Sequence, residues 1–343
     1  MKDSKKIVAE KIYVVCPAGI KTGGPELLHQ LVFTLNKNGF CAHIAYAGNI
    51  NHSYKIIDEY RQYINSYLLL PEIEDSPENL VIVPETNVFI LKKYKNIQKA
   101  IWWLSVDNFY LRYFSMEAIK YRISAWGFLR FVKRSFFTRS VMNPENYLSM
   151  DSKLIRSIHF HLCQSIYAVE ECKKHSLAPI YLSDYLNDEF FSGKTGEINK
   201  ENIVVYSPAK GFKFTNKIIK RNPDINFVPI ENMTRMQVLN LLARAKVYID
   251  FGNHPGKDRI PREARMQGCI VITGKNGSAK YFEDVSIEEK FDKSPKNISV
   301  ISTLIKQIFD NYAIWNNKQI DYTNFIKTEK EVFNKDVVSI FGA

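Results

Sequence analysis

Short runs of apolar, often β-branched residues alternate along the chain with segments in which apolar residues recur every three or four positions. The clearest example begins with residues 12–16, an apolar run that ends at Pro17 and is typical of a buried strand. Pro25, after two glycines, favours the start of a helix, and Gly39 favours its end. With a further apolar run at 41–46, this order predicts a strand–helix–strand unit and therefore a parallel sheet.

The same alternation continues through the rest of the chain. In the first half it predicts strands at 80–83, 99–106, 158–164 and 180–182 and a short helix at 87–96. The polar stretch 192–202, SGKTGEINKEN, favours a linker. Beyond it we expect strands at 203–206, 226–230, 246–251 and 270–273, and helices at 215–221, 234–245, about 261–267 and 298–312.

Two consecutive α/β halves are therefore the predicted organisation. We place the first domain at 1–191 and the second at 203–320. Residues 321–343 are predicted to form a C-terminal helix that packs back on the first domain.

Composition adds a charge argument to this picture. Among 343 residues, 47 Lys and Arg against 36 Asp and Glu give a net charge of +11, which suits an anionic partner such as nucleic acid, anionic lipid or a phosphorylated small molecule. No segment approaches 18 uninterrupted apolar residues and no signal cleavage site follows the N-terminus, so we expect a cytoplasmic protein. The five cysteines show no C-x-x-C spacing and are expected to be buried, reduced thiols.

Several common motifs are absent from the sequence. It contains no GxxxxGK[ST], no GxGxxG and no Asp-x-Asp, so a P-loop, a dinucleotide fingerprint and the commonest metal–diphosphate pair are not supported. His159 and His161 would lie on one face of a strand, and a structural role is favoured for them over metal binding.

Two glycine-containing loops are candidate ligand sites. The turn at 19–24, with Gly23 and Gly24, lies between a strand and a helix, where backbone N–H groups can approach an anion; an ordinary tight turn is the alternative. Lys210 and Lys213 follow a strand of the second half, at the sheet edge where ligands of open α/β sheets bind. Two ammonium groups there suit a diphosphate, although a solvated basic loop has the same composition.

The densest signal is the stretch 250–274, DFGNHPGKDRIPREARMQGCIVITG. Its Gly/Pro-rich loop carries Lys257, Asp258 and Arg259, and we expect Glu263 in the first turn of the next helix. The basic residues could face phosphates and the carboxylate could accept bonds from ribose hydroxyls. Alternatively, Glu263 only complements the helix dipole.

These blocks together resemble the GT-B glycosyltransferases, especially the retaining, group 4-like class of bacterial surface polysaccharide synthesis. The resemblance is carried by TGGPELLHQLVFTLNKNGF at 22–40, by Ala209–Gly211 and by PREARMQGCIVITGKNGS at Pro261–Ser278. It implies two Rossmann-like domains facing across a cleft, an acceptor-binding first domain and a second domain that binds a nucleotide-sugar donor without a divalent metal or other cofactor. It further implies that Lys210 binds phosphate, that Glu263 binds ribose, and that Gly277 and Ser278 lie near the sugar or diphosphate.

The chain also departs from that family's pattern. The family's paired glutamates are eight residues apart, but Pro255 stands eight positions before Glu263, and Asp258 or His254 could replace the missing carboxylate. Lys213 or Arg259 could replace a missing arginine. In the first domain, Glu85 and Asp107 at strand ends are candidates for contacting the acceptor hydroxyl or the donor sugar.

Over half of the net charge lies in residues 111–141, where seven basic residues and one acid interleave with eight aromatic ones. This composition suits an anionic membrane interface, and also single-stranded nucleic acid or a helix pair with an aromatic core. Because the segment 111–141 follows a strand of the first domain, we expect it on the side that binds the acceptor. A lipid-linked diphosphate acceptor would bring both a membrane and negative charge to that side.

The function predicted from these features is metal-independent transfer of a sugar from a nucleotide-sugar donor to a glycan or lipid-linked acceptor in cell-surface polysaccharide synthesis. The catalytic candidates are Glu85, Asp107 and Asp258. We expect no nucleic-acid partner and a peripheral place on the inner face of the plasma membrane. The alternatives are a nucleic-acid-binding protein that uses 111–141 and a non-catalytic GT-B-like partner subunit.

Overall fold

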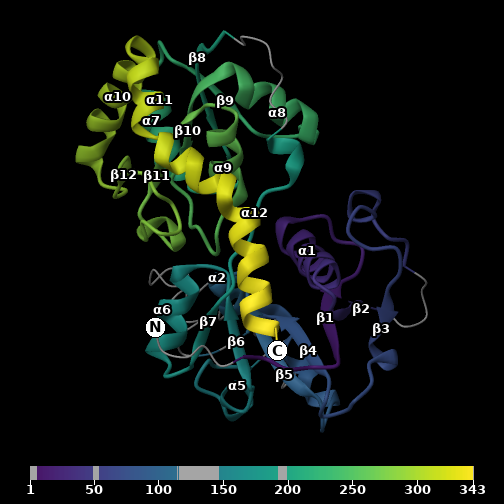
Figure 1. Ribbon diagram of the computed structural model, residues 1–343. Coiled ribbons are helices and arrows are strands. Elements are labelled where there is room, and N and C mark those ends of the chain that lie inside the picture. Colours follow the sequence, from purple (N-terminus) through teal and green to yellow (C-terminus); the bar gives the residue numbers. More distant parts are fainter. Residues whose placement is uncertain (1–5, 49–53, 114, 116–146, 192–198, 343) are drawn as a thin grey trace. The chain divides into compact units, whose positions relative to one another are not determined.

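The computed structural model describes residues 6–48, 54–113, 115, 147–191 and 199–342. The chain forms two compact units (Figure 1). Unit 1 comprises Met1–Ser183 together with Phe333–Ala343, and unit 2 comprises Asp184–Val332. The chain returns to unit 1 within its last helix, α12 (Ile320–Phe341).

Among its described residues, unit 1 is built on a seven-stranded parallel sheet with the order β3-β2-β1-β4-β5-β6-β7. The strands are β1 (Lys11–Pro17), β2 (Cys41–Ala47), β3 (Leu68–Leu69), β4 (Leu80–Pro84), β5 (Gln98–Trp103), β6 (Phe160–Cys163) and β7 (Pro179–Tyr181). The helices are α1 (Gly23–Lys37), α2 (Val106–Arg112), α5 (Lys153–Arg156) and α6 (Ile166–Lys174), with short 3-10 segments η1 (Asp58–Tyr60), η2 (Leu70–Glu72) and η3 (Glu85–Lys93).

The central strands of this sheet are buried on both faces. Every residue of β4 is buried, as are the five interior residues of β1, which explains their continuous apolar runs. The end of α12 covers part of unit 1, where the Phe333 ring stacks on Trp102 and the Ile340 carbonyl accepts a bond from the Ile7 N–H at 2.7 Å.

The described part of unit 2 contains a five-stranded parallel sheet with the order β12-β11-β10-β8-β9. Its strands are β8 (Glu201–Tyr206), β9 (Asn226–Pro229), β10 (Ala245–Asp250), β11 (Ile270–Gly274) and β12 (Lys290–Phe291). Its helices are α7 (Phe212–Arg221), α8 (Arg235–Arg244), α9 (Arg259–Met266), α10 (Pro295–Asp310), α11 (Tyr312–Lys318) and the first part of α12, with 3-10 segments η6 (Asp188–Phe190) and η7 (Ser278–Lys280). Two apolar clusters, which include alternate residues of β8, β10 and β11, form its core.

The strand–helix alternation predicted from the sequence is confirmed, with local differences. The segment expected as an α-helix at 87–96 is the 3-10 segment η3, and α9 begins at Arg259 rather than Pro261. The strand expected to end at Asp107 ends at Trp103, so Asp107 lies in the first turn of α2. The capping box at Thr234 and Gln237 is confirmed.

Most of the basic, aromatic stretch 111–141 lies outside the described residues. Only Leu111 and Arg112 at the end of α2, Tyr113 and Ser115 are described. Within the described part of the chain, no helix is both long and apolar enough to span a membrane.

Candidate active site

The loops that follow β8 and β10 meet at the carboxyl edge of the second sheet, because these strands are parallel neighbours with Ile249 opposite Tyr206. Gly211 lies where the loops touch. Its φ is +62°, and a Cβ there would overlap the carbonyl group of Phe251. Only glycine combines that backbone conformation with so close an approach. The expected Lys-Gly step is therefore a packing point that fixes Lys210 at the sheet edge.

Lys210 forms an ion pair across this contact. Its Nζ lies 2.5 Å from Asp258 Oδ2, and the two side chains are 36% and 14% exposed. Asp258 directly precedes α9, where the helix N-terminus favours an anion. The sequence predicted that Lys210 binds the donor phosphate and that Asp258 takes part in catalysis. The structure brings these two residues together. A partly exposed ammonium at the carboxyl edge of a parallel sheet is chemically suited to bind a diphosphate.

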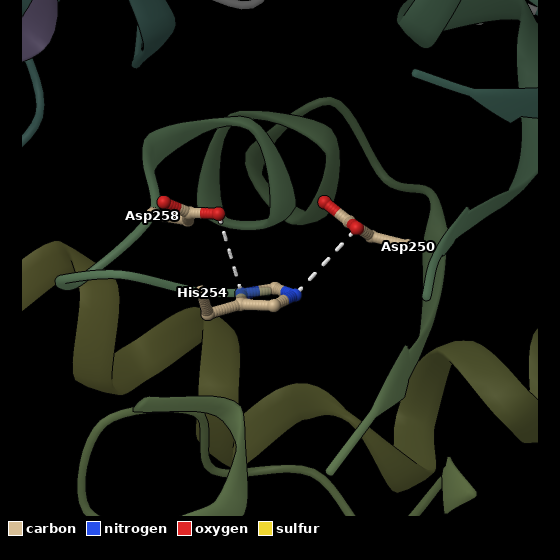
Figure 2. A group of neighbouring side chains, drawn as sticks. All are labelled: Asp250, His254 and Asp258. Atoms are coloured by element: carbon tan, nitrogen blue, oxygen red, sulfur yellow. Dashed lines mark ion pairs between the residues drawn. The ribbon is translucent and has the colours of Figure 1, made fainter. Parts of the chain in front are cut away.

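His254 lies buried beside this pair, between two carboxylates (Figure 2). Its Nδ1 is 3.5 Å from Asp258 Oδ2, and its Nε2 is 3.6 Å from Asp250 Oδ1. Neither ring nitrogen makes a hydrogen bond. Asp250 also accepts a bond from the Gly252 N–H at 2.8 Å and one from the Tyr248 hydroxyl at 3.2 Å. Sequence reasoning missed Asp250, although its position at the end of a strand was a usable signal.

Gly277 and Ser278 hold the same loop in place. The backbone N–H of Ser278 donates to the His254 carbonyl at 2.9 Å, and its hydroxyl donates to the Gly256 carbonyl at 2.6 Å. Gly277 has a φ of +63°, and a Cβ there would overlap the His254 carbonyl. Ser278 is fully buried and its hydroxyl is used within the loop. The expectation that Gly277 and Ser278 lie near the sugar or diphosphate stays a prediction.

Lys257 takes part in a buried ionic cluster with Asp184, Arg262 and Glu329. Arg262 Nη2 is 2.6 Å from Asp184 Oδ2 and its Nη1 is 2.7 Å from Glu329 Oε2, while Lys257 Nζ is 2.7 Å from Glu329 Oε1. All four residues are at most 4% exposed. Lys257 therefore faces carboxylates inside the protein, which corrects the expectation that it faces a phosphate.

The cluster is balanced in charge, with two cations and two anions. Burial opposes the charge on Asp184, but the neighbouring Arg262 and Lys257 lower the pKa of its carboxyl. Burial likewise opposes the charge on Arg262, and the carboxylates of Asp184 and Glu329 raise the pKa of its guanidinium. Sequence reasoning missed Asp184, Arg262 and Glu329, because such distant partners leave no local pattern.

Three further donor-site candidates lie on the helices α7 and α9 of unit 2. Arg259 is the first residue of α9 and is partly exposed. Glu263 is partly exposed and lies in the second turn of α9, because that helix begins earlier than expected. Lys213 is exposed in the first turn of α7. Their contacts with a nucleotide sugar stay predictions.

The candidates of unit 1 lie at the carboxyl edge of its sheet. Gly23 and Gly24 are partly exposed and open α1, and a Cβ on Gly24 would make only an ordinary contact with Leu104, at 3.7 Å. Neither glycine has a positive φ, so the left-handed conformation that requires glycine occurs at neither position. Backbone approach of an anion there stays a prediction.

Glu85 and Asp107 are both buried. The Glu85 carboxylate accepts a bond from the Leu104 N–H at 3.0 Å, and burial raises its pKa to about 7. Asp107 accepts a bond from the Tyr167 hydroxyl at 2.9 Å. Both carboxyls are thus used within unit 1, and their contact with a substrate stays a prediction.

His161 in β6 and His159 just before it have the structural role that the sequence favoured. His161 is buried and accepts a bond from the Trp103 indole at 3.3 Å, and burial lowers its pKa to about 4. His159 is exposed and accepts a bond from the Lys99 N–H at 3.0 Å. All five cysteines are free thiols, of which Cys41 is exposed.

The chain was compared with protein families, curated proteins and solved structures. No family model matches the chain. The alpha-1,6-glucosyltransferase of Actinobacillus pleuropneumoniae serotype 7 (strain AP76) is 24% identical over 285 residues, which are 78% of this chain and 73% of that protein.

Solved structures share the fold over most of the chain. TarM is 13% identical with a TM-score of 0.53, and the alignment covers 79% of this chain and 56% of TarM, so the chain spans about half of that protein. Anabaena Alr3699/HepE in complex with UDP-glucose is 10% identical with a TM-score of 0.56, covering 96% of this chain and 98% of that one.

The predicted α/β fold with two parallel sheets, the GT-B fold of glycosyltransferases, is confirmed by these structures. Fold and curated relative agree on one class of enzyme, the glycosyltransferases, which is the class that the sequence predicted.

Proposed function

We propose that the protein transfers a sugar from a nucleotide-sugar donor to a glycan or lipid-linked acceptor in cell-surface polysaccharide synthesis. The observation that carries the proposal is the Lys210–Asp258 pair at the carboxyl edge of the second sheet, next to the start of α9. A glycosyl transfer from such a donor leaves negative charge on the departing diphosphate. Fixed cationic groups that stabilise this charge lower the barrier, which is commonly the largest electrostatic contribution to catalysis.

The donor would engage the residues of unit 2. The diphosphate would draw the Lys210 ammonium away from Asp258, with Arg259 and Lys213 adding positive charge nearby. Glu263 would accept hydrogen bonds from the ribose. Binding of UDP-glucose by Alr3699/HepE and the glucosyltransferase name of the curated relative support a nucleotide-sugar donor.

The sequence expectation of metal-independent transfer is part of the proposal, because the basic groups supply the positive charge that a cation would otherwise provide. Peripheral membrane contact through 111–141 also stays part of it. The comparisons do not favour nucleic-acid binding or a non-catalytic subunit.

The test measures binding of UDP, GDP, ADP and CMP by calorimetry, followed by release of each nucleotide from its sugar conjugate in the presence and absence of EDTA. Lys210→Ala should weaken nucleoside diphosphate binding about 10- to 100-fold, the loss of one charge-assisted hydrogen bond. Lys217→Ala is the matched control, since Lys217 is an exposed lysine of the adjacent helix α7. No binding of any nucleotide, or equal affinity in both variants, would refute the proposal.

A further inference from the structure

Two nitrogen donors compete for a single oxygen of Asp258. Lys210 Nζ lies 2.5 Å from Oδ2 and bonds it, whereas His254 Nδ1 faces the same Oδ2 from 3.5 Å, beyond hydrogen-bond distance. Lys210 reaches solvent, while His254 is fully buried. Asp258 Oδ2 is therefore bonded by Lys210, which can move into solvent, and faced by His254, which is enclosed by the protein.

The second nitrogen of His254 faces a carboxylate that is itself fixed. Nε2 faces Asp250 Oδ1 (Figure 2), at 3.6 Å. That oxygen already accepts the Gly252 N–H at 2.8 Å. The backbone of His254 is fixed as well, because its carbonyl accepts the Ser278 N–H. The ring therefore has carboxylates on both sides and only small rotations available to it.

While Lys210 bonds Asp258, His254 Nδ1 lacks a hydrogen bond. A buried polar group without a hydrogen bond destabilises the folded protein, because it has lost its bonds to water without replacement. His254 has two such nitrogens, each a few tenths of an ångström too far from its carboxylate. A movement of that size by Asp258 toward the ring would give the missing bond and lengthen the bond to Lys210.

We propose that His254 is a positioning residue that takes over Asp258 when the donor diphosphate draws Lys210 away. The inference rests on the phosphate-binding role proposed for Lys210. A hydrogen on Nδ1 then donates to Asp258 Oδ2. Asp258 thereby exchanges one hydrogen-bond donor for another, so the release of Lys210 leaves no unbonded carboxylate oxygen in a half-buried loop. His254 thereby sets the affinity for the diphosphate without touching it.

Asp250 of β10 and Asp258 at the start of α9 face the two ring nitrogens of His254. In the described part of the chain, Asp250 also interacts with the Tyr248 hydroxyl and with the charge of Lys293, whereas Lys210 pairs with Asp258. The exchange of partners at Asp258 therefore concerns Lys210 and His254, and a double-mutant cycle can test it.

The experiment measures UDP, GDP and ADP affinity by calorimetry for the full chain, for His254→Ala, for Lys210→Ala and for the double variant. His254→Ala should weaken binding of the tightest nucleotide about tenfold, and in the Lys210→Ala background it should change binding less than twofold. His254→Asn, whose amide nitrogen can stand near the position of Nδ1, should recover most of the loss. In the unaltered protein, the nitrogen-15 resonance of His254 Nδ1 should shift when the nucleotide is added.

The outcomes separate this inference from the proposed function. If no nucleotide binds the unaltered protein, both fail. If Lys210→Ala weakens binding while His254→Ala does not, or if His254→Ala weakens binding equally in both backgrounds, the inference fails and the proposed function stands. An Nδ1 resonance that does not respond would also overturn it, even if the alanine variant fails to fold. Stoichiometric binding of Mn²⁺ or Zn²⁺ alone, lost in Asp250→Asn, would show a metal site instead.

Discussion

Replacing Glu329 by glutamine should destabilise unit 2 strongly. Glu329 bonds Arg262 through one carboxylate oxygen and pairs with Lys257 through the other, both at 2.7 Å and both out of contact with water. The glutamine keeps the volume and removes the charge. Two buried cations then share the single carboxylate of Asp184, and the cluster changes from neutral to +1.

The size of the effect follows from this imbalance. Breaking a buried ion pair by removing one partner costs about 3–5 kcal/mol, because the remaining charge is left uncompensated. Unit 2 has roughly 150 residues, so the melting temperature should fall by about 6–20 °C. The neighbouring Lys330 provides a matched control: its pair with Asp188 is 48% and 69% exposed, so Lys330→Gln should cost about 0–1 kcal/mol.

The assay is urea unfolding followed by circular dichroism, supported by calorimetric melting, for both variants beside the unaltered protein. Equal stability of Glu329→Gln and Lys330→Gln, within about 0.5 kcal/mol, would refute the reasoning. It would mean that water or a rearranged partner compensates the buried cations.

Two further predictions concern single residues, Glu85 and Gly211. Burial raises the pKa of Glu85 to about 7 from an ordinary 4.5, so the folded protein retains a proton that the unfolded chain has lost; between these values stability should fall as pH rises, by about 3 kcal/mol in total. Urea unfolding at pH 5 and pH 8 should show this fall in the unaltered protein and not in Glu85→Gln, and equal falls in both would contradict it. Gly211→Ala should lower the free energy of unfolding by about 2–4 kcal/mol, because the backbone is left-handed there and the new Cβ overlaps Phe251. Gly39→Ala should lower it by about 1 kcal/mol, because φ is +84° but the space around the residue is open. Melting curves of the two alanine variants check this, and equal losses would show that the contact at Gly211 relaxes freely.

The fold was largely predictable because parallel strands buried on both faces are continuous apolar runs in the sequence. The runs at 12–16, 80–83 and 270–273 are strands in the structure, and Gly39 ends the first helix as expected. Short elements with few residues to carry a pattern, such as β3 and β12, were not found.

The sequence predicted where the candidate site lies, but only part of what its residues do. Lys210 was predicted from its place in the loop after a strand, since every parallel strand of a sheet ends at one edge. Asp258 was predicted from its glycine-rich loop and from the family resemblance, and the structure pairs it with Lys210. Lys257 was predicted to bind a phosphate. The local sequence of a lysine in a glycine-rich loop is the same whether the lysine binds a phosphate or pairs with a carboxylate inside the protein. Its actual partner, Glu329, lies 72 positions further along the chain, and no spacing rule reaches that far.

The division of the chain has a practical consequence for exchanging parts between relatives. Unit 1 is not one continuous stretch of sequence, since Phe333–Ala343 completes it after the whole of unit 2 has been passed. A gene fragment that stops at Ser183 would leave Trp102 without the ring of Phe333 and Ile7 without its bond to Ile340. A hybrid that borrows unit 2 from another protein must therefore be joined at two points, and its second junction falls inside a helix.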